Sequence, residues 1–424
     1  LMLSPARHPD TIAALVASLR PRFAVIDGRL AHTWAEALGT SQERTRLLTV
    51  GDPAPGCPAF EELARTVVDG FSTVSTHRDD PAVMLFSGGT TGRPKAVVQS
   101  HRSYAFTTQA YGQRILGLKA DDITLAVPKL FFGYAMGSNL FFPFSVGASA
   151  CLFPEKATAE SVFAAIARHR PSVLVNVPTM IQQMVSHPGA PAQDLASLRL
   201  ATSAGEPLAV TLRERWNEIF GVELLDGLGT AEQWHIFISH QRGRVRPGTL
   251  GEVVPGFEVR VRDDAGLDLP DGEIGSLWVR GGARAWGYFR EMDKTQAAFR
   301  GEWVVPGDLV SRDADGFFTY QGRGDDVFKV AGRWFSPAEV EGTLLRRPQV
   351  AECAVVGIVD ENGLVKPHAW VIPRQTTPGL AQALADFVAH ELLPFKAPRV
   401  VHLVAELPRT HLGMLPPRAR RGAR

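Results

Sequence analysis

The sequence predicts an α/β fold in three successive parts. Short apolar runs alternate with amphipathic stretches from residue 10 to about residue 265, which is typical of β–α–β units. We therefore expect a large N-terminal part with mostly parallel sheets flanked by helices. Glycines and short strand-like runs dominate from about residue 250, which indicates an antiparallel appendage. The end of the chain returns to mixed helix and strand patterns, so we expect a small C-terminal α+β domain.

Each element of the first part follows from its residue pattern. Apolar runs bounded by turn residues predict strands at 23–26, 47–50, 83–86, 123–127, 149–153, 173–177, 200–202 and 223–225. Amphipathic periodicity predicts helices at 11–19, 101–117, 159–169, 180–186 and 211–220. Together they make a strand–helix alternation.

The later elements are shorter. We expect appendage strands at 251–254, 257–261, 276–279, 302–305 and 317–320. The last unit should hold a helix at 338–346, strands at 352–358 and 368–372, and a helix at 380–392. Glycines and acids interrupt both periodicities at 322–326, which predicts domains at 1–322 and 323–424.

Composition excludes several classes of protein. The chain of 424 residues has 45 basic and 44 acidic side chains, so no charge excess predicts binding to nucleic acid or to a membrane. Cys57, Cys151 and Cys353 are far apart with no CxxC motif, which fits a reducing cytoplasm and predicts no zinc site. The first residues do not resemble a signal peptide. Residues 131–153 lack charge but contain glycines and a proline, so we expect a buried helix-turn-strand rather than a membrane span.

One loop carries the strongest chemical signal. The apolar run at 83–86 leads into a loop of small hydroxyl and glycine residues that ends in a lysine: Ser87, Gly88, Gly89, Thr90, Thr91, Gly92 and Lys95. Glycines allow close approach to an anion, and hydroxyl and N–H groups can bind its oxygens. The loop predicts binding of ATP phosphates. The spacing is not that of a Walker A motif, and a simple polar turn is the alternative.

Further clusters follow in an informative order. They occupy 203–207, 226–232, 303–308, 322–332 and 336–341. With the loop, they resemble the acyl-adenylate-forming (AMP-binding) enzyme family, which includes acyl- and aryl-CoA ligases. The segments 129–134, 142–148 and 235–237 are most similar to the benzoate-CoA ligase branch.

The resemblance implies a two-step reaction that uses ATP and Mg²⁺, with CoA as the second substrate. The carboxylate of an aromatic acid attacks ATP to give an acyl-adenylate, and an acceptor then displaces AMP. Lys95, Glu232 and Arg323 take the catalytic roles, and Glu232 is the metal ligand. Asp308 binds the ribose hydroxyls, as an ionised carboxylate can. From the residues alone, Glu232 could be a surface carboxylate, Asp308 a turn residue and Arg323 part of a hinge salt bridge.

The resemblance also assigns the walls of the site. The remaining nucleotide-binding residues are Gly205, Glu206, Pro207, Asp226, Gly227, Leu228, Gly229 and Thr230. The aromatic acid is expected against Phe132, Gly133, Tyr134, Gly205, His235 and Ile236. Relatives usually carry alanine where this chain has Gly133, so we expect room for a substituted or extended aryl acid. The alternative for His235 is a hydrogen-bonded core histidine.

The chain departs from the family pattern at several positions. Met414 stands where the family has a lysine that neutralises charge in the first step, and its loss predicts slow adenylation. Ala231 replaces a threonine, and Pro306 replaces a threonine or serine. The family's opening section is expected to be missing before Leu1. Asp325 matches the family hinge, about which the last domain moves between steps.

The leading hypothesis is an aryl-acid adenylating ligase with CoA as the default acceptor. A second hypothesis keeps the adenylate and changes the acceptor to an amine, a carrier-protein thiol or, in diazo formation on an amino-aryl acid, nitrite. A third is a nucleotide-binding pseudo-ligase with impaired catalysis. The expected partners are an aromatic acid, ATP and an acceptor, and the sequence leaves a homodimer open.

Overall fold

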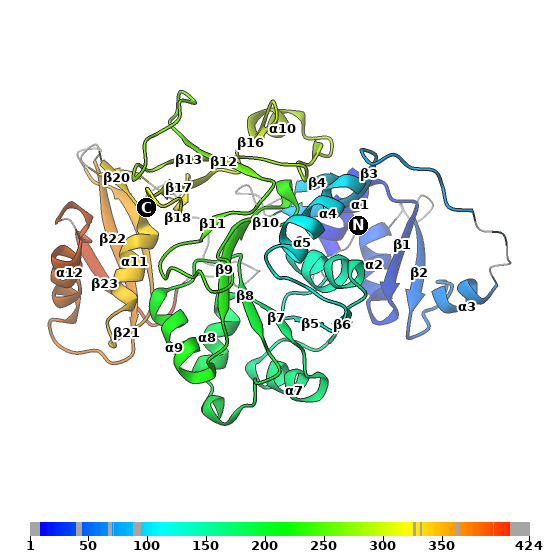
Figure 1. Ribbon diagram of the computed structural model, residues 1–424, viewed down its shortest axis with the longest axis horizontal. Helices are drawn as coiled ribbons and strands as arrows, with labels where there is room; N and C mark the ends of the chain where they lie inside the picture. Colours follow the sequence, from blue (N-terminus) through cyan, green and yellow to red (C-terminus); the bar gives the residue numbers. More distant parts are fainter. Residues whose placement is uncertain are drawn as a thin grey trace. The chain divides into compact units, whose positions relative to one another are not determined.

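The computed structural model describes residues 9–39, 45–66, 70, 72–87, 95–324, 328–330, 333–361, 364–392 and 394–407. The chain forms two compact units, Leu1–Asp80 and Pro81–Arg424, and each is described by itself (Figure 1). The predicted boundary between residues 322 and 323 stays a prediction, and Asp325 lies outside the described residues.

The first unit is built on two parallel strands, β1 (Phe23–Asp27) and β2 (Arg46–Val50). Its helices are α1 (Pro9–Leu19), α2 (Ala31–Leu38) and α3 (Phe60–Arg65). Ile12, Val16 and Leu38 form a small apolar core between α1 and α2. Helices α2 and α3 were not predicted; both are short, at eight and six residues.

A seven-stranded sheet organises the second unit (Figure 1). Its order is β11 (Glu252–Val253), β10 (Ile236–Ser239), β9 (Leu224–Gly229), β8 (Leu200–Ser203), β7 (Val173–Asn176), β5 (Ile123–Ala126) and β6 (Ser149–Cys151). Strands β5, β6, β7, β8 and β9 are parallel to one another. Strand β10 pairs antiparallel with both β9 and β11. The parallel part confirms the predicted β–α–β organisation.

Helices and an antiparallel layer cover the two faces of this sheet. One apolar cluster joins the sheet to α7 (Ala159–His169), α8 (Pro178–Ser186) and α9 (Val210–Phe220). On the other face lies α4 (His101–Thr107), which continues as a π-helical turn over Thr108–Gln113. The single helix predicted at 101–117 is therefore two segments of different pitch.

The uncharged stretch at 131–153 has the predicted helix-turn-strand form. It comprises α5 (Gly133–Met136), a π-helical turn at Gly137–Phe141, α6 (Phe142–Ser145) and β6. In the part of the chain that the structure describes, no helix is both long and apolar enough to cross a bilayer.

The antiparallel layers include the strands on either side of the loop predicted to bind phosphate. Strand β3 (Pro81–Ser87) pairs with β4 (Lys95–Ser100), which also pairs with β14 (Gly287–Tyr288). A second sheet holds β12 (Glu258–Arg262), β13 (Gly275–Arg280), β15 (Phe299–Arg300), β16 (Trp303–Val304), β17 (Asp308–Arg312) and β18 (Phe318–Arg323). Helix α10 (Met292–Ala298) connects β14 to this sheet.

The last segment has its own apolar cluster, which includes Phe335, Val340, Val355, Val371 and Leu384. It contains the hairpin β19 (Phe328–Val330) and β20 (Arg333–Phe335), and the sheet β21 (Val350–Val359), β22 (Val365–Pro373) and β23 (Val400–Leu403). Helices α11 (Pro337–Leu345) and α12 (Leu380–Glu391) complete it. The α+β composition is as predicted, whereas β19, β20 and β23 were missed.

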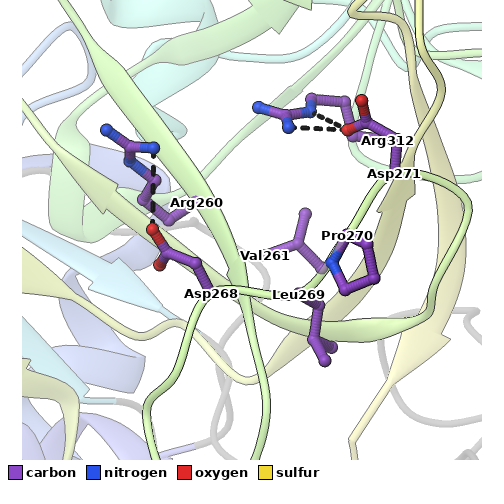
Figure 2. Close-up of a pocket in the computed structure, with 7 residues that line it drawn as sticks. All are labelled: Arg260, Val261, Asp268, Leu269, Pro270, Asp271 and Arg312. Carbon is purple, nitrogen blue, oxygen red and sulfur yellow. Dashed lines mark hydrogen bonds and ion pairs between the residues drawn. The ribbon is translucent and has the colours of Figure 1, made fainter.

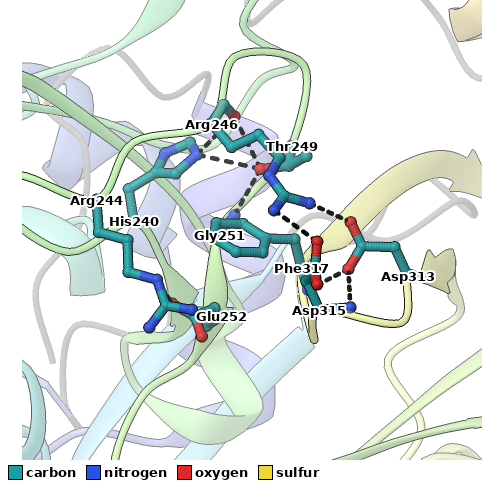
Figure 3. Close-up of polar contacts among 9 residues, drawn as sticks. All are labelled: His240, Arg244, Arg246, Thr249, Gly251, Glu252, Asp313, Asp315 and Phe317. Carbon is teal, nitrogen blue, oxygen red and sulfur yellow. Dashed lines mark hydrogen bonds and ion pairs between the residues drawn. The ribbon is translucent and has the colours of Figure 1, made fainter.

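Ion pairs and hydrogen bonds connect the segment after β10 to the turn between β17 and β18 (Figure 3). Arg246 lies 2.6 Å from Asp313 and 2.9 Å from Asp315, and its guanidinium is 3.9 Å from the centre of the Phe317 ring. The carbonyl oxygen of Arg246 lies 3.0 Å from Nε2 of His240. The network therefore links a surface turn to a side chain buried next to β9.

Candidate active site

The β3–β4 hairpin places Ser87 directly opposite Lys95. The loop residues between them, Gly88 to Gly92 among them, lie outside the described residues. The Ser87 hydroxyl is buried and has no hydrogen-bond partner within the described part of the chain. The Lys95 ammonium lies 4.7 Å from the centre of the Tyr288 ring, a cation–π distance.

Glu232 lies in a 3₁₀ turn directly after β9. Its side chain is buried, with 6% of the residue exposed, so the alternative of a surface carboxylate is wrong. The hydroxyl of Tyr288 donates a hydrogen bond of 2.8 Å to its Oε1. The backbone of Glu232 is also hydrogen-bonded, because its carbonyl accepts a hydrogen bond of 2.9 Å from the N–H of Ala285. Burial and the Glu232 carboxylate raise the pKa of Tyr288, so its hydroxyl keeps its proton.

A strained turn follows Glu232. Trp234 has φ 62° and ψ −49°, and the N–H of His235 donates to the carbonyl of Gln233 at 2.7 Å. This is a γ-turn with positive φ, a conformation that costs about 1–3 kcal/mol for a non-glycine residue. The turn separates Glu232 from His235.

Asp308 and Arg323 pair across two antiparallel strands. Asp308 is 4% exposed, and its Oδ1 accepts hydrogen bonds from Arg323 at 3.1 Å and from the Tyr320 hydroxyl at 3.4 Å. Asp308 therefore begins a strand rather than a turn, and Arg323 does form a salt bridge. Burial raises the pKa of Asp308, Arg323 opposes this, and the charge of Glu232 adds to the rise.

His235 lies inside a cage of aromatic rings. Its ring centre is 5.0 Å from that of Tyr111, 5.4 Å from that of Tyr134 and 4.7 Å from that of Phe142. Nε2 is 3.0 Å from the Tyr134 carbonyl and 3.0 Å from the Ser138 hydroxyl. Burial lowers the pKa of His235 to about 3, so the imidazole is neutral. Nδ1 is buried with no hydrogen-bond partner among the described residues.

Other residues predicted for the aryl pocket have different surroundings. The Tyr134 hydroxyl lies 2.5 Å from that of Thr202 at the end of β8. Ile236 is buried in the apolar core at 2% exposure, whereas Phe132 is 49% exposed. The expectation that Gly133 leaves room for a larger acid is wrong. A Cβ there would lie 2.9 Å from Cδ1 of Leu85 and 3.1 Å from the Trp234 carbonyl, so protein atoms already fill this space.

The predicted adenine walls lie at neighbouring strand ends. Ser203 and Asp226 are paired in the β8–β9 register, at the carboxyl edge where open parallel sheets bind ligands. Asp226 is buried, and burial raises its pKa to about 7. Glu206 accepts hydrogen bonds from the backbone N–H and hydroxyl of Thr179. Gly205 has φ 88° and is exposed with Pro207.

The Asp226–Thr230 motif belongs largely to strand β9, which was expected to end at residue 225. Gly227 and Gly229 are required by the neighbouring strand. A Cβ at Gly227 would lie 2.7 Å from the Ile238 carbonyl, and one at Gly229 would lie 2.5 Å from the His235 carbonyl. Leu228 is packed against the apolar core, and the Thr230 hydroxyl is buried without a hydrogen-bond partner within the described ranges.

Sequence reasoning missed Tyr288 and Tyr320, whose hydroxyls contact Glu232 and Asp308 respectively. Gly287 before Tyr288 is required by the structure, because a Cβ there would lie 2.5 Å from Thr295. A glycine–tyrosine pair between two glycine-rich segments is otherwise unremarkable in sequence. Asp325 and Met414 lie outside the described residues.

Two cavities bounded by described residues lie elsewhere. One is small and is lined by Arg260, Val261, Asp268, Leu269, Pro270, Asp271 and Arg312, whose charges are paired with one another (Figure 2). The other is lined by Arg102, Gly256, Phe257, Glu258, Arg280, Gly281, Gly282, Arg284, Gly301 and Glu302. Neither includes a residue that the sequence assigned to the site. No cluster of three or more His, Cys, Asp or Glu side chains suits a metal ion in the described ranges.

Comparison with known proteins matches this geometry to one family. Residues 1–289 match the family model of the AMP-binding enzyme, and residues 339–413 match that of the AMP-binding enzyme C-terminal domain. The chain is 37% identical over 421 residues to the 4-hydroxybenzoate–CoA/benzoate–CoA ligase of Rhodopseudomonas palustris, with 98% of this chain and 78% of that protein covered. It is also 37% identical to the benzoate–CoA ligase of Thauera aromatica, over 93% of this chain and 75% of that protein. The solved structure of the anthranilate CoA ligase AuaEII in complex with anthranoyl-AMP has a TM-score of 0.91 at 35% identity, and covers 97% of this chain and 80% of that one.

Proposed function

Because the chain belongs to the AMP-binding enzyme family, we propose that it activates an aromatic carboxylic acid with ATP and transfers the acyl group to CoA. An acid oxygen forms a bond to the α-phosphorus while the bond to the β-phosphate breaks, which gives an aryl-adenylate and pyrophosphate. The CoA sulfur then bonds to the carbonyl carbon, loses its proton, and AMP leaves with the C–O electron pair.

One observation carries the proposal. Lys95 and Glu232 both contact Tyr288, and the charge of Glu232 acts on Asp308. A cation and a buried carboxylate from segments far apart in sequence thus meet at one side chain, and the charge of that carboxylate raises the pKa of a second one, Asp308. This supports assigning Lys95 and the Ser87 loop to the phosphates and Asp308, with Arg323, to the ribose. Gly205 to Pro207 and Asp226 to Thr230 would line the adenine.

The residues fit Mg²⁺ as a nucleotide-bound metal. Glu232 supplies one buried carboxylate, and its Oε2 has no hydrogen bond to any described residue. Mg²⁺ commonly uses one or two carboxylates together with substrate phosphates rather than a full protein cage. When bound, it would neutralise phosphate charge during adenylate formation.

The aromatic rings around His235 support an aromatic acid as the substrate. We propose that the aromatic ring of the acid lies beside His235, Tyr134 and Gly205. The relatives act on benzoate and 4-hydroxybenzoate, and one binds anthranoyl-AMP. A neutral imidazole with an unpaired Nδ1 would accept a hydrogen bond from an amino or hydroxyl substituent.

Acid-dependent exchange of labelled pyrophosphate into ATP tests the first step. The panel should hold benzoate, aminobenzoates, hydroxybenzoates, cinnamate and a medium-chain aliphatic acid. Exchange with aryl acids is the expected result, and exclusive exchange with the aliphatic acid would refute the aryl pocket. Binding of ATP without any exchange would favour a pseudo-ligase.

A second assay identifies the acceptor. AMP release should be measured with the preferred acid and CoA, an amine, a carrier-protein thiol or nitrite in turn. We expect release to be fastest with CoA. Faster AMP release with another acceptor would mean that the protein forms the adenylate but does not use CoA as its acceptor.

We also propose that Met414 slows adenylation relative to a lysine at this position. A missing cation costs on the order of a hundredfold to a thousandfold in rate. Met414→Lys should therefore raise pyrophosphate exchange, with Met292→Lys on the exposed start of α10 as the control. Unchanged exchange in Met414→Lys would show that another group supplies the charge.

The domain assignment is part of the same proposal. We infer that residues 323–424 form the small domain and that Asp325 is its hinge. Asp325→Pro should slow thioester formation more than pyrophosphate exchange, because it restricts the backbone needed for the second conformation. Equal loss in both steps would argue against a hinge.

A further inference from the structure

Tyr288 contacts both Lys95 and Glu232. Its hydroxyl donates to Oε1 of Glu232 at 2.8 Å, and its ring centre lies 4.7 Å from the Lys95 ammonium. Each charged group therefore uses a different part of one side chain. No ion pair joins Lys95 to Glu232 anywhere in the described part of the chain.

The backbone fixes Tyr288 in this place. Strand β14 pairs Tyr288 with Val97, two residues after Lys95 on β4. Backbone hydrogen bonds from Trp286 and Phe289 to β4 flank the pair, at 2.9 and 2.8 Å. The Tyr288 ring packs edge-on against Phe299, with the ring centres 5.5 Å apart, and only 7% of Tyr288 is exposed.

Two opposite charges beside one nucleotide site tend to pair with each other. A lysine and a carboxylate in a partly buried site attract strongly when water is excluded. A direct ion pair would have to break before Lys95 could meet a phosphate and Glu232 could meet a metal, which would weaken nucleotide binding. The phenol satisfies both groups without neutralising either, since the hydroxyl binds the carboxylate and the ring face attracts the ammonium.

We propose that Tyr288 is a positioning residue that keeps Lys95 and Glu232 apart and ready for MgATP. The inference rests on the proposed function, because it assigns Lys95 to phosphate and Glu232 to metal. Tyr288 itself performs no chemical step. It holds the two charges in the arrangement that the bound nucleotide requires.

Two substitutions separate the two contacts. Tyr288→Phe keeps the ring face for Lys95 and removes the hydroxyl that binds Glu232. Tyr288→Leu removes both and leaves space for a direct ion pair. Tyr104→Phe is the matched control, because Tyr104 packs against Phe141 and Trp234 and contacts neither charged group in the described structure.

The first measurement is binding without catalysis. Mn²⁺ binding, followed by the electron paramagnetic resonance of free Mn²⁺ with a non-hydrolysable ATP analogue, reports on the Glu232 side. We expect Tyr288→Phe, which loses the hydrogen bond to Glu232, to weaken Mn²⁺ binding about threefold. Tyr288→Leu also loses the cation–π contact with Lys95, and we expect it to weaken Mn²⁺ binding about tenfold. The KM of the aromatic acid should stay within twofold. Unchanged Mn²⁺ and nucleotide affinity in Tyr288→Leu, despite lower stability, would reduce Tyr288 to a packing residue and overturn the proposal.

The second measurement is independent of the reaction. A double-mutant cycle with Lys95→Met and Glu232→Gln reports their coupling in urea unfolding without nucleotide. We expect near-additive effects with Tyr288 present, and a coupling of at least fivefold in the unfolding constant in the Tyr288→Leu background. Equal coupling in both backgrounds would overturn the proposal. If that coupling appears while Mn²⁺ and the ATP analogue do not bind to the unaltered protein, the separation of charges stands and the proposed function fails.

Discussion

Gly137→Ala should damage acid recognition without affecting nucleotide binding. A Cβ at Gly137 would lie 2.6 Å from Cδ2 and 3.0 Å from Nε2 of His235, and 2.8 Å from Cζ of Phe142. Gly137 has helical φ and ψ, so alanine fits its backbone and the effect is purely steric. Both rings are buried, so the added methyl has to displace one or both of them, and the His235 ring is the nearer.

The structure sets the size of the effect. Moving the ring separates Nε2 from the Tyr134 carbonyl and the Ser138 hydroxyl, both at 3.0 Å. At about 1 kcal/mol for each buried hydrogen bond, returning the ring to the orientation proposed to bind the acid would cost about 2 kcal/mol, or about thirtyfold in kcat/KM for the acid. Overpacking of the core should lower the free energy of unfolding by about 1–3 kcal/mol.

Pyrophosphate exchange, with acid and ATP varied in turn, gives the two KM values, and urea unfolding gives the stability. Gly342→Ala in α11 is the matched control, because its Cβ would meet nothing within 4 Å. If Gly137→Ala leaves the KM of the acid unchanged while stability falls, the His235 ring does not contact the acid. A parallel rise in both KM values would point to a general disturbance of the site.

The remaining predictions concern stability. The pKa of Asp226 is raised to about 7 by burial, so the folded protein keeps a proton that the unfolded chain releases from about pH 4 upwards. Stability should therefore fall as pH rises from about 4 to 7, by up to about 4 kcal/mol, and Asp226→Asn should remove that fall in urea unfolding at several pH values. Glu206→Ala should lower stability by less than about 1 kcal/mol, because it removes the acceptor for the Thr179 N–H at 3.0 Å, and Glu206→Gln should recover most of it. Arg246→Ala should make the turn at Asp313 exchange its amide hydrogens faster, a change that hydrogen exchange can locate.

The sequence predicted the strand–helix order of the second unit because its period is regular there. Strand β9 is a case in which local sequence preferences predict the wrong end of a strand. Glycine normally argues against a strand interior, yet Gly227 and Gly229 lie inside β9, because a Cβ at either position would meet a carbonyl of the segment leading into β10 or of β10 itself. That constraint comes from a neighbouring strand, which no local pattern reports.

In the candidate site, too, local motifs could be predicted from the sequence, whereas contacts between distant segments could not. Ser87, Lys95, Glu232 and Asp308 could be proposed from motif order, whereas the contacts of Lys95 and Glu232 with Tyr288 could not. Strand β14 is only two residues long and pairs with β4, which lies almost 190 residues earlier in the chain. The false expectation at Gly133 has a similar cause, since Leu85 fills the space from a separate strand.

The γ-turn at Trp234 limits which substitutions could change the acid specificity proposed for this protein. Glu232 directly precedes this tight turn and His235 ends it, so a shift of the histidine along the chain would also move the carboxylate. Libraries that seek bulkier substrates should therefore vary the wall built by α5 and leave Gln233 to His235 untouched. On the roles proposed for these residues, substitutions in α5 can change selectivity alone, whereas substitutions at Gln233 to His235 would also disturb Glu232.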